Sequence, residues 1–126
     1  MCKIADKPIG GYFSLELPGR NDCFPNDTGV LVNSGHGALE FVLRNIGDVA
    51  KVLLPYYTCD IVARTLQRCG VEYGFYHVNA SLELATHLKL GYGEYLIFTN
   101  YFGIKDKYVA SLAEIYGCKL IVDNAQ

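Results

Sequence analysis

The C-terminal stretch, residues 119–126, constrains the fold of this chain more than any other part of its sequence. Leu120, Ile121 and Val122 form a short continuous apolar run, which is typical of a strand buried on both faces of a parallel sheet. The run leads into Asp123, which this pattern places at the carboxyl end of the strand. Because ligands of open α/β sheets bind at the carboxyl ends of the strands, this acid is the first candidate for a functional site.

From residue 30 onward, short strand patterns alternate with amphipathic helix patterns. This alternation implies right-handed crossovers, so we predict an α/β fold with a mostly parallel sheet and flanking helices. The predicted strands are residues 30–32, 51–54, 71–78, 94–99 and 120–122. The predicted helices carry apolar side chains at helical spacing over 39–46, 58–68 and 105–116. For residues 79–92 we expect a loop with one helical turn.

The chain is expected to have two parts. Prolines, glycines and turn-forming residues interrupt residues 1–29, which predicts an irregular arm with one short strand at residues 12–17. Residues 30–126 are expected to form one α/β domain, because 126 residues suffice for one small domain but not for two. Since the last predicted strand has no helix after it, we expect the chain to be the front part of a larger protein.

Charge and composition exclude several function classes. Eleven basic and thirteen acidic residues give a net charge of -2 without a basic cluster, so we expect no nucleic-acid partner. No apolar run approaches membrane-spanning length, and residues 1–6 lack the core of a signal peptide, so we expect no membrane partner. Five cysteines without Cys-x-x-Cys spacing favour reduced thiols, a cytoplasmic location and no zinc site.

Four loops follow predicted strands and are expected at one edge of the sheet, at residues 33–37, 55–59, 100–103 and 123–126. The first loop, Asn-Ser-Gly-His-Gly, has the chemistry of a phosphate cradle. Glycines allow close backbone approach, and the first amides of a helix attract anions. The same residues also fit a plain helix N-cap at Ser34 followed by a tight turn.

The other loops offer fewer specific signals. Tyr56 and Tyr57 are suited to covering a flat ligand or to packing under a neighbouring loop. Cys59 stands near a predicted helix start, where it is either an activated nucleophile or a plain buried cysteine. Asp123 is either a partner for a cationic ring nitrogen or a turn aspartate, and Gln126 follows it at hydrogen-bonding range of the same ligand. No histidine has metal-ligand spacing, so we predict no metal site.

Taken together, the four loops resemble a known family. Residues 34–39 (Ser-Gly-His-Gly-Ala-Leu), 55–59 (Pro-Tyr-Tyr-Thr-Cys), 101–103 (Tyr-Phe-Gly) and 122–126 (Val-Asp-Asn-Ala-Gln) are similar to the N-terminal part of pyridoxal-phosphate-dependent aminotransferases of the DegT/DnrJ type. The resemblance runs from residue 34 to residue 126. It implies part of the large domain of a fold-type-I aminotransferase, with pyridoxal 5'-phosphate as the cofactor.

The resemblance assigns the phosphate to the glycine turn. Gly35, His36 and Gly37 would lie against the cofactor phosphate, by match to the family's Ser-Gly-Thr-x-Ala-Leu turn. His36 replaces the family's threonine, which removes one hydroxyl donor to the phosphate.

The resemblance assigns the pyridine ring to the other loops. Asp123 would pair with the ring nitrogen and keep it protonated, and Gln126 would contact the phenolic oxygen. Cys59 stands where the family places an aromatic residue on the ring, so ring coverage would pass to Tyr57.

Activity is implied for the parent protein rather than for this chain. The family binds the cofactor as a Schiff base on a lysine well downstream, and none of the seven lysines here matches it, so we assign no catalytic residue and expect an inactive chain. The parent would be a homodimer that moves an amino group from a donor such as glutamate to a keto sugar nucleotide. The alternatives are a non-catalytic α/β interaction or remnant module and a Rossmann-like nucleotide-binding domain. The Rossmann-like alternative is disfavoured, because the sequence lacks the glycine-rich dinucleotide-binding fingerprint.

Overall fold

The computed structural model describes residues 29–125. The strand expected at residues 12–17 and the site residue Gln126 lie outside this range. The chain divides into two compact units, Met1–Leu31 and Val32–Gln126, and the second contains every helix and strand described here.

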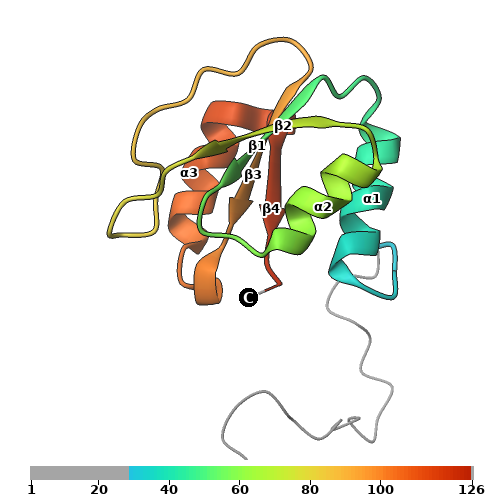
Figure 1. Cartoon of the computed structure of the whole chain (residues 1–126). Helices are drawn as coiled ribbons and strands as arrows, with labels where there is room; N and C mark the ends of the chain where they lie inside the picture. Colours follow the sequence, from blue (N-terminus) through green and yellow to red (C-terminus); the bar gives the residue numbers. More distant parts are fainter. Residues whose placement is uncertain (1–28, 126) are drawn as a thin grey trace, which may run out of the picture. The chain divides into compact units, whose positions relative to one another are not determined.

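The second unit is built on one sheet of four parallel strands in the order β2-β1-β3-β4 (Figure 1). The strands are β1 (Lys51–Pro55), β2 (Glu72–Tyr76), β3 (Glu94–Thr99) and β4 (Leu120–Asp123). The predicted α/β fold with a parallel sheet is therefore confirmed. The strand order reverses between β1 and β3, because the chain moves outward in opposite directions from these two central strands. In open sheets such a reversal creates a crevice at the carboxyl edge.

Three α-helices cover the two faces of the sheet: α1 (Gly35–Ile46), α2 (Asp60–Arg68) and α3 (Asp106–Tyr116). In Figure 1, α1 and α2 lie side by side on one face and α3 lies on the other. Two short 3-10 turns, η1 (Tyr101–Gly103) and η2 (Gly117–Lys119), flank α3.

Alternation along β3 explains how both faces acquire a core. Ile97 faces α1 and α2, where it packs in a buried cluster with Leu43 of α1 and Leu66 of α2. Phe98 faces the opposite side, where its ring meets that of Tyr108 from α3 at a centroid distance of 5.5 Å. All four residues from Leu96 to Thr99 are buried, which is the expected behaviour of a central parallel strand.

The structure corrects three details of the sequence prediction. Residues 30–32 form no strand, because a strand needs a neighbour and none of the four described strands pairs with them. Residues 79–92 contain turns and one isolated bridge, Val78 to Leu84, but no helical turn. The second helix begins at Asp60 rather than near residue 58, because Cys59 has extended backbone angles and serves as the N-cap residue.

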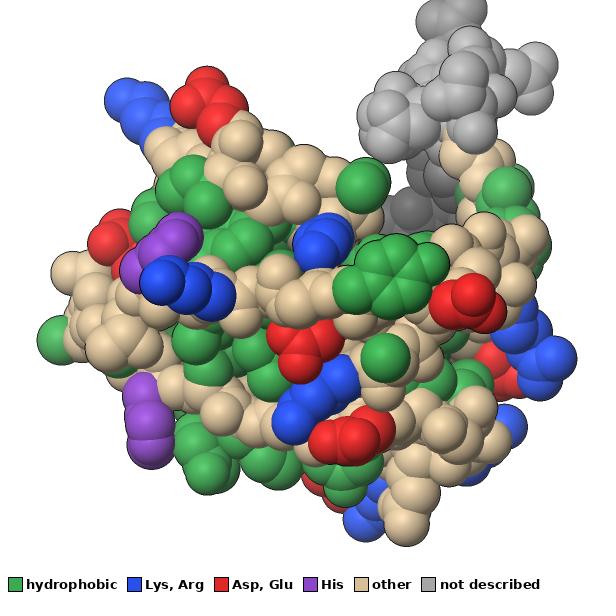
Figure 2. Space-filling view, turned by 90° about the horizontal axis from the view of Figure 1, so that it is seen from above, with side chains coloured by type: hydrophobic (Ala, Val, Ile, Leu, Met, Phe, Trp, Pro, Cys, Tyr) green, Lys and Arg blue, Asp and Glu red, His purple; other side chains and the backbone are tan. Residues whose placement is uncertain are grey.

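Charge is mixed on the face shown in Figure 2. Lysine and arginine side chains lie next to aspartate and glutamate side chains, with hydrophobic groups between them, rather than in a patch of one sign. Among the described helices, none has both the length and the apolar character that crossing a bilayer requires.

A buried tyrosine is expected to make the folded state less stable at alkaline pH. Tyr76 is 5% exposed and its hydroxyl donates to Ile97 O at 2.9 Å. Burial, followed by the nearby Tyr101, raises the pKa of this phenol above its ordinary value of 10.0. The unfolded chain therefore loses this proton first as pH rises above about 10, so unfolding becomes easier there by about 1.4 kcal/mol per pH unit. We expect the urea midpoint to fall between pH 9 and pH 11.

The matched variant is Tyr76→Phe, which keeps the ring and removes the ionisable group. At pH 7 it should lose about 1 kcal/mol, because the hydrogen bond to Ile97 O is lost. Its urea midpoint should fall less steeply above pH 9 than that of the original chain. Parallel slopes for the two proteins would show that Tyr76 is not responsible.

Candidate functional site

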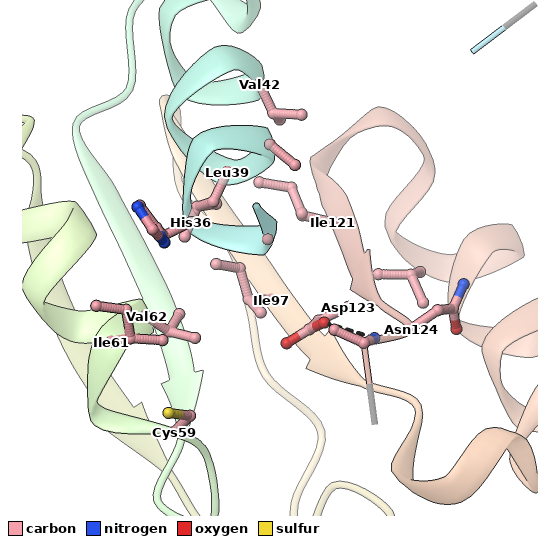
Figure 3. Close-up of a pocket in the computed structure, with 14 residues that line it drawn as sticks. His36, Leu39, Val42, Cys59, Ile61, Val62, Ile97, Ile121, Asp123 and Asn124 are labelled. Atoms are coloured by element: carbon pink, nitrogen blue, oxygen red, sulfur yellow. Dashed lines mark hydrogen bonds between the residues drawn. The ribbon is translucent and has the colours of Figure 1, made fainter. Parts of the chain in front are cut away.

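A cavity of about 590 Å³ lies between α1, the start of α2 and the β3–β4 half of the sheet (Figure 3). Its walls are mostly apolar, with Leu39 and Val42 of α1 facing Ile97 and Ile121 of the sheet. The polar groups lie toward the carboxyl edge of the sheet. Those that bear on the sequence predictions are Gly35, His36, Cys59 and Asp123. An apolar space with a few convergent polar groups is the usual form of a small-molecule site.

The glycine turn forms the N-terminus of α1. Ser34 is the N-cap residue, and its Oγ accepts a hydrogen bond from the Gly37 amide at 3.2 Å. The first intrahelical bond runs from the Ala38 amide to Ser34 O at 2.9 Å. The amides of Gly35 and His36 precede that bond, so they belong to the helix N–H groups that seek a partner outside the helix. The N-cap interpretation is therefore correct, and the amides of Gly35 and His36, two residues that line the cavity, are left without an intrahelical partner.

The two glycines of this turn differ in what surrounds them. A Cβ atom built on Gly35 would meet nothing within 4 Å, although Gly35 lines the cavity. A Cβ atom on Gly37 would lie 3.1 Å from Ser34 Oγ and 3.2 Å from Asn33 Oδ1. A side chain at Gly37 would therefore crowd the cap, whereas at Gly35 the protein leaves space that its own atoms do not fill.

The charge of Glu40, on the second turn of α1, is balanced by its neighbours. Arg44 donates to Glu40 Oε1 at 2.6 Å, and Arg68 lies 3.8 Å from Oε2. The hydrogen bond and charge of Arg44 lower the pKa of Glu40, and Glu40 in turn raises the pKa of Arg44. Because these arginines neutralise Glu40, its carboxylate does not strongly oppose an anion at the start of α1.

Asp123 lies at the end of β4, and its carboxylate points into the cavity (Figure 3). Its register partner is Thr99 on β3, so it shares the face of the sheet that carries Ile97 and Ile121. The Ala125 amide donates to Asp123 Oδ1 at 2.9 Å. Within residues 29–125, Oδ2 has no hydrogen-bond partner, so this oxygen is available to a ligand.

Cys59 and Tyr57 have different surroundings, although both follow β1. Cys59 lines the cavity as the N-cap residue of α2 and is exposed, so it is not a plain buried cysteine. Tyr57 does not line the cavity. Its ring stacks on Tyr101 with centroids 5.3 Å apart, and the Tyr101 hydroxyl donates to Tyr57 O at 2.5 Å.

The structure thus brings Gly35, His36, Cys59 and Asp123 to one cavity and leaves Gly37 behind the cap and Tyr57 outside. Sequence analysis did not single out Asn124, which also lines the cavity. Its position directly after Asp123 is the one sequence feature that could have indicated a place at the cavity.

Most of the described lysines are engaged elsewhere. Lys105 Nζ donates to Glu83 Oε1 at 2.8 Å, and Lys119 Nζ donates to Gly91 O at 2.7 Å. Lys51 pairs with the Glu72 carboxylate at 3.1 Å. No lysine between residues 29 and 125 lines the cavity. The same range contains no group of three side chains suited to holding a metal ion.

Comparison of the chain with protein-family models, with curated proteins and with solved structures gave no match. Functional assignment therefore depends on the sequence motifs and on the geometry of the cavity.

Proposed function

We propose that residues 32–126 form part of the cofactor-binding domain of a pyridoxal-phosphate-dependent aminotransferase of the DegT/DnrJ type. The observation that carries the proposal is that Gly35 and His36, at a helix N-terminus, line the same apolar cavity as Asp123, at a strand end. These are the two polar features that the cofactor's two ends need, a site for a phosphate and an acid for a ring nitrogen.

The chemistry of the lining suits this group. The amides of Gly35 and His36 would bind the phosphate, with the His36 side chain beside them. The carboxylate of Asp123 would hold a proton on the pyridine nitrogen, while Leu39 and Ile121 provide apolar contact for the ring. When bound, the cofactor supplies an electron sink for reactions at the carbon bearing an amino group.

The proposal assigns no catalytic residue to the described part of the chain, because no lysine there lines the cavity. The chain by itself is expected to bind the cofactor without transamination. A homodimeric parent enzyme, glutamate as donor and a keto sugar nucleotide as acceptor follow from the sequence resemblance alone, which is an analogy at the level of the family.

Titration of the 126-residue chain with pyridoxamine 5'-phosphate tests the proposal. This form of the cofactor cannot form an imine with surface lysines, so calorimetry reports non-covalent binding only. We expect saturable one-to-one binding, with backbone amide shifts centred on Gly35, His36 and Asp123. Pyridoxamine without the phosphate should bind at least about tenfold more weakly, because it lacks the charge-assisted hydrogen bonds. Absence of binding, or tighter binding of ATP, would overturn the proposal.

Two variants give this titration matched controls. Gly35→Ala should fold with unchanged or slightly higher stability, because a Cβ there meets nothing and alanine favours helix. Its methyl group occupies space beside the phosphate, so affinity should fall about tenfold if roughly 1.4 kcal/mol is lost. Asp48→Ala, in the loop before β1, should bind as the original chain does. Equal affinity of Gly35→Ala would exclude the α1 terminus as the phosphate site.

A further inference from the structure

Asn100 is a buried polar residue at the turn that follows β3. It is 4% exposed and its side chain makes three hydrogen bonds. Nδ2 donates to Asn124 Oδ1 at 2.9 Å and to Asp106 Oδ1 at 2.8 Å, and Oδ1 accepts from the Lys105 amide at 2.9 Å. Both N–H groups of the amide are therefore used, and no other side chain of similar size offers two donors and an acceptor in this arrangement.

These bonds connect two segments that are distant in the sequence. Lys105 and Asp106 begin the third helix, whereas Asn124 follows β4. The backbone N–H of Asn100 also donates a hydrogen bond to the backbone oxygen of Asp123 at 2.8 Å. Asn100 therefore holds the end of β4 through both the backbone of Asp123 and the side chain of the next residue.

β4 is one of the two edge strands of the described sheet, so its end has pairing from one side only. In the described sheet β4 pairs only with β3, and all four of its residues are half-buried. Asp123, whose carboxylate points into the cavity, directly precedes Asn124 in the sequence (Figure 3). A small rotation of this strand end would turn the acid away from the cavity, and a displacement of about 1 Å is enough to weaken a polar site greatly.

We propose that Asn100 is a positioning residue for the cofactor site, which acts by fixing the strand end that carries Asp123. The identity of the ligand in this inference rests on the proposed function, whereas the hydrogen bonds of Asn100 do not depend on it. Asn100 does not line the cavity, so its effect on binding would pass through Asp123.

A double-mutant cycle on binding of pyridoxamine 5'-phosphate tests this role. Asn100→Ala should weaken binding about tenfold in the original chain and by less than about twofold in an Asp123→Asn background. A merely structural role would lower affinity equally in both backgrounds. Asn124→Ala removes the hydrogen bond from Asn100 Nδ2 at an exposed residue, so it should fold fully. Because Asn124 also lines the cavity, its effect on affinity supports the positioning role only if it disappears in the Asp123→Asn background. Asn45→Ala, on the exposed surface of α1, is the matched control and should leave affinity unchanged.

A second readout does not depend on the ligand. The Ala125 amide donates to Asp123 Oδ1, so its proton chemical shift reports the position of the carboxylate. In Asn100→Ala and in Asn124→Ala this shift should move toward its value in an unstructured chain, while amides in α2 remain unchanged. If the original chain fails to bind the ligand but the Ala125 shift moves, the proposed function is wrong and the positioning role stands. An unmoved Ala125 shift in both variants, or additive effects in the cycle, would refute the positioning role.

Discussion

Replacement of Phe98 by alanine is expected to lower the free energy of unfolding by about 3–5 kcal/mol. Phe98 is fully buried at the centre of the sheet, and its ring makes edge contacts with Tyr101 at 6.4 Å and Tyr108 at 5.5 Å. Removal of a buried phenylalanine ring costs about 3–5 kcal/mol, from lost burial and from the cavity left behind. A domain of this size has a total stability of about 5–15 kcal/mol, so the loss consumes a large share of it.

Far-ultraviolet circular dichroism against urea measures this loss. The matched control is Phe102→Ala, since Phe102 is 66% exposed and has a left-handed backbone with φ of 55°. It should change stability by no more than about 0.5 kcal/mol, as is usual for surface substitutions. Equal destabilisation by the two variants would mean that the α3 face of the sheet is not the core that the structure describes.

Asp123→Asn is expected to weaken binding of pyridoxamine 5'-phosphate by about tenfold to a hundredfold, the range for loss of a hydrogen bond to a charged group. The substitution keeps an oxygen that accepts from the Ala125 amide, so the turn after β4 is retained. It removes the negative charge that would favour a protonated ring nitrogen. The change should therefore affect binding and leave thermal stability close to that of the original chain.

Asp60→Asn provides the control for charge alone. Asp60 lies at the start of α2, next to the cavity residue Cys59, but its exposed carboxylate pairs with Arg64 at 2.7 Å. The Asp60→Asn variant should bind the ligand with an affinity within about twofold of that of the original chain, since exposed ion pairs contribute little. If both aspartate variants lost affinity equally, the effect would be one of overall charge rather than of a specific contact.

Much of the sheet could be predicted from sequence because its strands are locally encoded. The predicted bounds of β3 coincide with the structure, since its apolar run is bounded by Gly93 and Asn100. Residues 30–32 have a similar pattern but no strand, because pairing depends on a partner that sequence periodicity does not reveal. Ile61 is an apolar residue of the helix predicted over residues 58–68, yet it is 38% exposed, because it forms part of the cavity wall.

The site was predictable only where its residues stand at strand ends. Asp123 follows directly from the rule that parallel strands bring their carboxyl ends to one edge of a sheet, and it lines the cavity. Gly35 also lines the cavity, but as the first residue of α1, because the strand predicted before it at residues 30–32 is not formed. Tyr57 also follows a strand, but its ring stacks on Tyr101, a contact across 44 residues that no local pattern encodes. The partners of the Asn100 side chain lie up to 24 residues away, so its role is visible only in three dimensions.

The most direct test of the cofactor site is the protonation state of the bound pyridine ring. Pyridoxamine 5'-phosphate labelled with ¹⁵N in the ring should be bound to the 126-residue chain at a pH where the free ring nitrogen has lost its proton. The ¹⁵N chemical shift is predicted to show a protonated ring in the original chain, because the carboxylate of Asp123 holds the proton, and an unprotonated ring in Asp123→Asn. An unprotonated ring in the original chain, or the same shift in both proteins, would contradict the assignment of Asp123 and with it the aminotransferase proposal.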